Sequence, residues 1–78
     1  MDKTIITVNP KEIKLSTGVS VQMREPKVRD MRIAQEAKSD VEQELKLIGN
    51  LTAMTMDELD DLSIKDYTVL QTELKSFL

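Results

Sequence analysis

The apolar residues of the N-terminal third of the chain alternate with polar ones, which is the period of a β-strand. The segment Thr4–Val8 is rich in β-branched residues and is followed by Asn9-Pro10, a turn pair that a central strand does not accommodate. Alternation then runs through two further stretches, one on either side of Ser16-Thr17-Gly18. The pattern predicts a short strand followed by a β-hairpin within residues 1–25.

The apolar residues of the two stretches occupy every second position, and this parity predicts the register of the hairpin. Residues that oppose each other across an antiparallel pair lie on the same face of the sheet. A two-residue Thr17-Gly18 turn would set Leu15 opposite Ser20 and divide the apolar residues between two faces. A three-residue loop, Ser16-Thr17-Gly18, keeps them together and places glycine where such a loop needs a left-handed residue. The predicted pairs are Leu15 with Val19, Ile13 with Val21 and Lys11 with Met23.

After Pro26 the apolar residues recur at the three- and four-residue intervals of helices. Proline suits the first helical turn, so we predict a first helix from about Pro26 to Lys38. Three later helix starts are predicted where Ser or Thr precedes an acidic residue by three positions, the spacing of a capping box. These boxes are Ser39–Glu42, Thr55–Glu58 and Ser63–Asp66. The predicted apolar stripe of the first helix is Val28, Met31, Ala34 and Ala37.

The order of these elements predicts an α+β fold in a single domain spanning residues 1–78. A β-hairpin or small antiparallel sheet would occupy residues 1–25, and three to four short α-helices would occupy residues 26–78. The helix after Ser39 has the broadest apolar arc, and we expect Gly49 to be tolerated inside it. A chain of 78 residues is near the lower limit for a self-sufficient core, so association with a partner or with further copies is expected.

Composition argues against catalysis and cofactor binding. The chain contains no cysteine and no histidine, which removes the thiol nucleophile, the commonest general base near neutral pH and the commonest zinc ligands. Neither glycine lies in a glycine-rich phosphate loop. The acidic residues near the last two helix starts suit capping better than metal binding. We therefore expect no enzyme, no cofactor and no metal.

Charge is distributed unevenly along the chain. Residues 1–38 carry eight Lys or Arg against five Asp or Glu, whereas residues 39–78 carry three against nine. An acidic C-terminal half disfavours a phosphate backbone, so we expect no nucleic-acid partner. The apolar runs are too short for a membrane span or a signal peptide, and we expect a cytosolic protein without membrane contact.

The motifs in sequence order resemble the tail assembly chaperone family of contractile-tailed, Mu-like phages and prophages. The resemblance covers nearly the whole chain from about Ile13, and its entry motif is Arg24, Glu25 and Pro26, leading to Asp30. Members often carry Thr or Ser after this entry, whereas Lys27 stands here, so we expect proline rather than a side-chain cap to start the first helix. The other segments that carry the resemblance are Val41–Ile48, Leu51-Thr52, Thr55–Leu59, Leu62–Tyr67 and Leu70-Gln71.

The resemblance implies a non-enzymatic chaperone that binds the tape measure protein and keeps it soluble while the tail assembles. It also implies a location in the host bacterial cytoplasm, absence from the mature virion and a longer form of the chain made by ribosomal frameshifting. The small core and the apolar stripes predict self-association. Alternatives are a structural or connector component retained in the phage tail, or a small DNA-binding regulator that uses the helices from Thr55 and Ser63. The apolar stripes predict the residues that bind a partner, each of which is equally a candidate for ordinary core: Tyr67, Leu70, Leu74, Phe77, Val41, Leu45 and Ile48.

Overall fold

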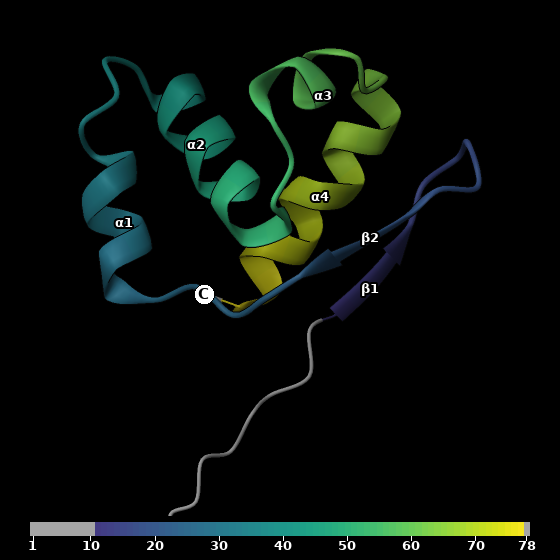
Figure 1. Cartoon of the computed structure of the whole chain (residues 1–78), viewed down its shortest axis with the longest axis horizontal. Coiled ribbons are helices and arrows are strands. Elements are labelled where there is room, and N and C mark those ends of the chain that lie inside the picture. The colour runs from purple at the N-terminus through teal and green to yellow at the C-terminus, as the bar shows by residue number, and fades with distance from the viewer. Residues whose placement is uncertain (1–10, 78) are drawn as a thin grey trace, which may run out of the picture.

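The computed structural model describes residues 11–77, and within them a two-stranded antiparallel sheet is followed by four helices (Figure 1). This is the α+β arrangement predicted from the sequence. The strand predicted at Thr4–Val8 lies outside the described residues. The elements are β1 (Lys11–Lys14), β2 (Ser20–Met23), α1 (Val28–Ala34), α2 (Asp40–Thr52), α3 (Met56–Asp60) and α4 (Ile64–Phe77).

The hairpin has the register that parity predicts, with Lys11 opposite Met23 and Ile13 opposite Val21. The Leu15 amide donates to the Val19 carbonyl across 2.9 Å, which continues the pairing up to the loop. Gly18 has φ of +91°, a conformation that side chains rarely adopt. The predicted three-residue loop is therefore confirmed.

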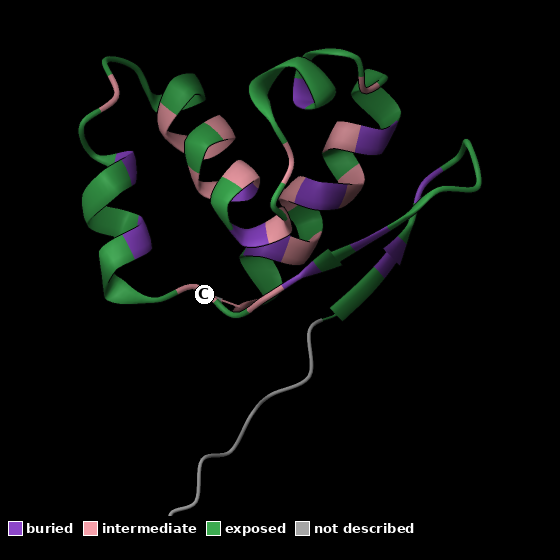
Figure 2. Ribbon diagram, in the orientation of Figure 1, coloured by how far each residue is buried: buried purple, intermediate pink, exposed green. Residues whose placement is uncertain are grey.

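The core lies where the inner face of the hairpin meets α2 and α4, and α3 closes one end of it (Figures 1 and 2). Its three largest fully buried side chains come from three different elements: Met23 from β2, Ile48 from α2 and Leu70 from α4. Alternate residues of each strand face inward, which is why the apolar parity of the sequence identified them. The other core members are Ile13, Leu15, Val21, Leu51, Leu59 and Leu74.

Two of the three predicted capping boxes differ from expectation in their second half. At Thr55 the box is complete, because the hydroxyl accepts from the Glu58 amide at 3.1 Å and the Glu58 carboxylate accepts from the Thr55 amide at 2.8 Å. At Ser39 the hydroxyl caps α2, but the Glu42 carboxylate accepts from the amide of Lys38, one residue earlier, at 3.3 Å.

The third box is divided between two parts of the fold. Ser63 accepts from the Asp66 amide at 3.1 Å, as predicted. The Asp66 carboxylate does not return to Ser63; it accepts from the amide and the hydroxyl of Ser16, both at 2.9 Å. The start of α4 is thereby attached to the hairpin loop, fifty residues away in the sequence. The acidic side chain at this helix start therefore stabilises a tertiary contact rather than a local box.

The first helix is shorter than the sequence predicted. It begins at Val28 and ends at Ala34, so Pro26 precedes it and Lys38 lies in the turn before α2. Of its predicted apolar stripe only Ala34 is fully buried, and Met31, another member of the stripe, is 49% exposed. The later start follows from Asp30, whose carboxylate accepts from the amide of Lys27, the residue before the helix, as described below.

Gly49 continues α2, as predicted, and lies at a close approach. A Cβ atom there would lie 3.2 Å from the Met54 carbonyl oxygen and 3.3 Å from Leu59 Cδ1. The helix ends at Ala53, which adopts left-handed geometry with φ of +59° and donates its amide to the Gly49 carbonyl. The chain thus has alanine at a position where glycine is favoured.

Candidate partner-binding site

The seven residues predicted to bind a partner fall into three classes of exposure. Three are fully buried in the protein's own core, three are half-buried against it, and one is exposed. The buried ones therefore stabilise this fold and present no side chain to a partner in this structure. The fully buried residues are Ile48, Leu70 and Leu74, and the half-buried ones are Leu45, Tyr67 and Phe77. The exposed residue is Val41, at 66% exposure.

The entry motif forms an ion pair at the end of β2. The Arg24 guanidinium donates two parallel hydrogen bonds to the Asp30 carboxylate, with nitrogen–oxygen distances of 2.7 and 2.8 Å. Asp30 is 2% exposed, and its carboxylate also accepts from the Lys27 amide at 2.8 Å. The hydrogen bonds from Arg24 lower the pKa of this carboxyl to about 2; burial opposes the shift, and the hydrogen bond from the Lys27 amide adds to it.

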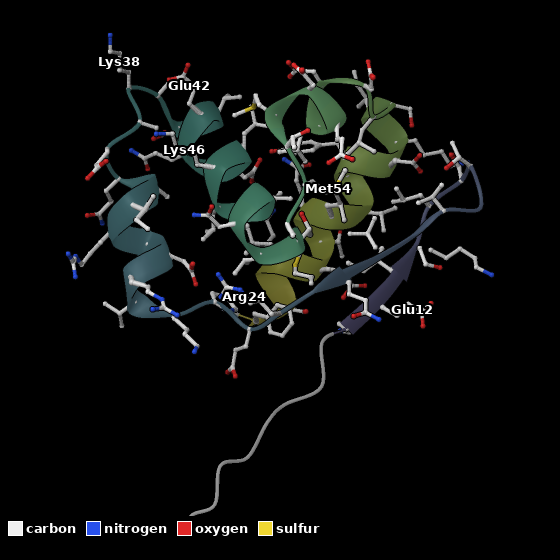
Figure 3. The ribbon with its side chains drawn as sticks, viewed as in Figure 1. Glu12, Arg24, Lys38, Glu42, Lys46 and Met54 are labelled. Atoms are coloured by element: carbon white, nitrogen blue, oxygen red, sulfur yellow. The ribbon has the colours of Figure 1, made fainter. Side chains whose placement is uncertain are left out.

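Through these contacts, Arg24 and Asp30 of the entry motif position α1. The Arg24 amide donates to the Leu51 carbonyl at 3.0 Å, so the end of β2 is held against the last turn of α2. Figure 3 shows Arg24 between the start of α1 and the end of α2. Lys27, which has no acceptor in its side chain, is the residue preceding the helix, and Asp30 three residues later satisfies its amide. The departure at Lys27 is therefore compensated by Asp30.

The first helix is held by this ion pair with little apolar burial. Its buried residues are Asp30 and Ala34, the latter against α2. Its other apolar side chains remain largely exposed: Val28 is 75%, Met31 49% and Ile33 45% exposed. Figure 2 shows α1 as mostly exposed ribbon beside a more buried body. An element that keeps apolar side chains in water is the strongest candidate for contact with another protein.

A groove with a volume of about 310 Å³ runs along one side of α1, and we call it the acidic groove. It is bounded by α1, α2 and the C-terminal part of α4. Among the described residues that line it, the ionisable ones are both acidic, Asp40 and Glu44. The full lining is Met31, Ala34, Gln35, Asp40, Gln43, Glu44, Leu47 and Leu74.

Glu44 is fixed in this groove by two hydrogen bonds from α4. Its Oε1 atom accepts from the Tyr67 hydroxyl at 2.7 Å and from Gln71 Nε2 at 2.8 Å. Burial and the neighbouring carboxylate raise the pKa of the Tyr67 hydroxyl. The tyrosine thus remains a neutral donor at ordinary pH, and the carboxylate keeps one orientation.

A second groove, with a volume of about 210 Å³, lies on the other side of α1, against α2 and α3. Its apolar lining includes Ile33, Met54 and Met56, and its charged member is Lys46. Figure 3 labels Lys46 on α2 and Met54 at the turn that follows it. We call this the basic groove. The two sides of α1 therefore present apolar surfaces with opposite charges.

The sequence predicts partner-binding residues in the stripes of α2 and α4, and the structure adds the exposed apolar side chains of α1 as further candidates. The predicted stripe of the first helix contains few large apolar residues, and those that its own fold leaves exposed are available for contact with another protein. Asp30, three positions after Lys27, was the available signal for the helix start. Within residues 11–77 no cluster of side chains is arranged to hold a metal ion, and no helix of that part is long and apolar enough to cross a membrane.

The family comparison covers nearly the whole chain. Residues 3–78 match the family described as phage tail assembly chaperone proteins, E, or 41 or 14. The chain belongs to this family. No curated protein and no solved structure matches it. In this tail assembly chaperone the Arg24–Asp30 pair is structural, and the apolar side chains beside it form the candidate binding surface.

Proposed function

We propose that this tail assembly chaperone binds the tape measure protein and keeps it soluble while the tail forms. The observation that carries the proposal is the family match over residues 3–78. The action is non-enzymatic binding in the host bacterial cytoplasm, and the protein leaves before the virion is complete. Self-association and a frameshift-extended companion belong to the same proposal.

The exposed side chains of α1 support a binding function. A long helical client presents apolar stripes before it is enclosed, and such a stripe is covered by a groove with apolar walls. Val28, Met31 and Ile33 provide apolar surface that the chaperone's own fold leaves uncovered. This surface accounts for binding without any catalytic group.

The test is co-expression of the chaperone with the tape measure protein encoded by the same phage. We expect the client to move from the insoluble to the soluble fraction and to co-elute with the chaperone in size exclusion. Light scattering on the complex then gives the number of chaperone copies, and mass spectrometry identifies any extended form. Changing Leu70 or Leu74 is unsuitable as a probe, since both are core residues.

A client that stays insoluble beside a folded chaperone would contradict the proposal. Detection of the 78-residue chain in purified particles would instead favour a connector retained in the tail.

A further inference from the structure

We infer that the acidic groove binds one helix of the client, and that this helix carries an apolar stripe flanked by Lys or Arg. The inference rests on the proposed function and names the chemistry of its partner. It follows from the lining of the groove, from the fixed position of the Glu44 carboxylate and from the contrast with the basic groove.

The walls of the acidic groove suit an apolar helix stripe. Met31 stands on the α1 side, Leu47 on the α2 side and Leu74 at the α4 end. Met31 is half exposed and unbranched, so it can adapt to side chains of different shape. A helix that covers this groove would remove apolar surface of both partners from water.

The negative charges of the groove favour Lys or Arg beside the apolar stripe of the client helix. Asp40 lies in the first turn of α2, where the positive end of the helix dipole offsets part of its charge. Glu44 lies one turn later and is held by Tyr67 and Gln71 through a single oxygen. Because Glu44 is already oriented, a Lys or Arg of the partner gains a charged contact without ordering the carboxylate first.

The opposite side of α1 gives the contrast that makes the selection specific. The basic groove has comparable apolar walls but carries Lys46 in place of carboxylates. A helix with basic flanks is repelled there and attracted to the acidic groove. The rival occupant is α1 of a second chaperone copy, since Arg29 and Arg32 flank its exposed apolar residues.

The binding test uses the full chain and two synthetic peptides of equal length. Each peptide is a fluorescein-labelled helix with leucines at helical spacing, flanked by lysines in one peptide and by glutamates in the other. We expect fluorescence anisotropy to give a Kd at least about tenfold lower for the lysine peptide at about 50 mM salt. That preference should decrease at about 500 mM salt, because ions screen the contact. Equal binding of the two peptides would overturn the inference.

Matched variants locate the contact. Met31→Asp is expected to weaken lysine-peptide binding about tenfold, whereas Ile64→Asp, at an 85% exposed position outside the groove, leaves it unchanged. Glu44→Gln keeps the oxygen that accepts from Tyr67 and should weaken binding several-fold. Its control is Asp57→Asn, an exposed acidic residue in the first turn of α3. Circular dichroism and urea midpoints confirm that each variant is folded.

Three results would separate this inference from the proposed function. If the wild-type chaperone solubilises the tape measure protein and Met31→Asp does so equally well, the groove assignment is wrong and the function stands. If lysine-peptide selectivity is found but the client stays insoluble, the proposed function fails. If Met31→Asp or Glu44→Gln changes the oligomeric state of the chaperone alone, the groove binds a second copy, and the inference is overturned.

Discussion

The first helix and the body formed by the hairpin, α2 and α4 are held in place by different forces. The body is built around fully buried Met23, Ile48 and Leu70. The first helix buries one alanine and is secured by the Arg24–Asp30 ion pair. Apolar burial stabilises in proportion to area, whereas a hydrogen-bonded ion pair fixes a position while leaving neighbouring side chains free. The protein thus keeps apolar groups exposed on an element whose orientation is nevertheless determined.

The two buried aspartates, Asp30 and Asp66, can be compared in the same way. Asp30 and Asp66 are the buried charged residues of the described chain, and each lies three residues after the residue that precedes its helix. Asp30 holds a cation at one end of β2, and Asp66 holds Ser16 in the loop at the other end. Two helix starts are therefore attached to opposite ends of one hairpin.

The largest predicted effect is loss of the body's core. Leu70→Ala should lower the free energy of unfolding by about 3 kcal/mol, because it removes a fully buried side chain and leaves a cavity. Met31→Ala should change it by less than about 0.5 kcal/mol, since Met31 is half exposed. Urea unfolding followed by circular dichroism measures both. Equal losses would show that α1 is as much a part of the core as α4.

A smaller effect is predicted for the ion pair. Asp30→Asn should weaken the attachment of α1 by about 1–2 kcal/mol, since the charge-assisted hydrogen bonds from Arg24 are lost. Hydrogen exchange should then become about tenfold faster in Val28–Ala34, while Ile48 and Leu51 in α2 remain protected. Uniform acceleration along the chain would contradict the separation of the two regions.

The pH dependence tests the same pair. The folded-state pKa of Asp30 is lowered to about 2, so its contribution to stability is complete above about pH 4 and is lost as the pH falls through about 2. The hydrogen bonds from Ser16 lower the pKa of Asp66, which adds to the loss in the same direction. Thermal unfolding between pH 6 and pH 2 should show a shallower acid decline for Asp30→Asn than for the wild type. Parallel declines would exclude Asp30 as a source of acid sensitivity.

A small gain in stability is predicted at the end of α2. Ala53→Gly should raise the free energy of unfolding by about 0.5–1 kcal/mol, because glycine adopts left-handed geometry without the strain of a side chain. The gain should appear as a higher urea midpoint with an unchanged slope, and it should leave hydrogen exchange in α1 unaffected. A lower midpoint would mean that unfolded-state entropy outweighs the strain.

The sequence predicted the hairpin and the helix order well, because both depend on local signals. Parity determines which strand residues share a face, and hydroxyl residues before acidic ones identified three of the four helix starts. The failures involve Asp30 and Asp66, whose carboxylates bind groups outside their own helices. The spacing of a capping box shows that a carboxylate lies near the helix start. It does not show that the carboxylate binds a residue fifty positions away, as Asp66 binds Ser16.

The residues predicted to bind a partner divide between core and surface for a related reason. Apolar periodicity identifies residues that avoid water, and it does not distinguish a residue buried by its own chain from one covered by a partner. Leu70, in the strong apolar stripe of α4, is buried in the core, whereas Met31, in the weak stripe of α1, is exposed. The distinction depends on how far α1 lies from α4, which no local pattern encodes.

The bond between Ser16 and Asp66 also bears on the order in which the chain folds during synthesis. The hairpin is translated before the helices, yet the partner of its loop, Asp66, is translated fifty residues after Ser16, and Leu70 and Leu74 follow it. Until α4 leaves the ribosome, the inner face of the hairpin lacks much of its cover. The hairpin therefore cannot complete its packing until α4 has been translated.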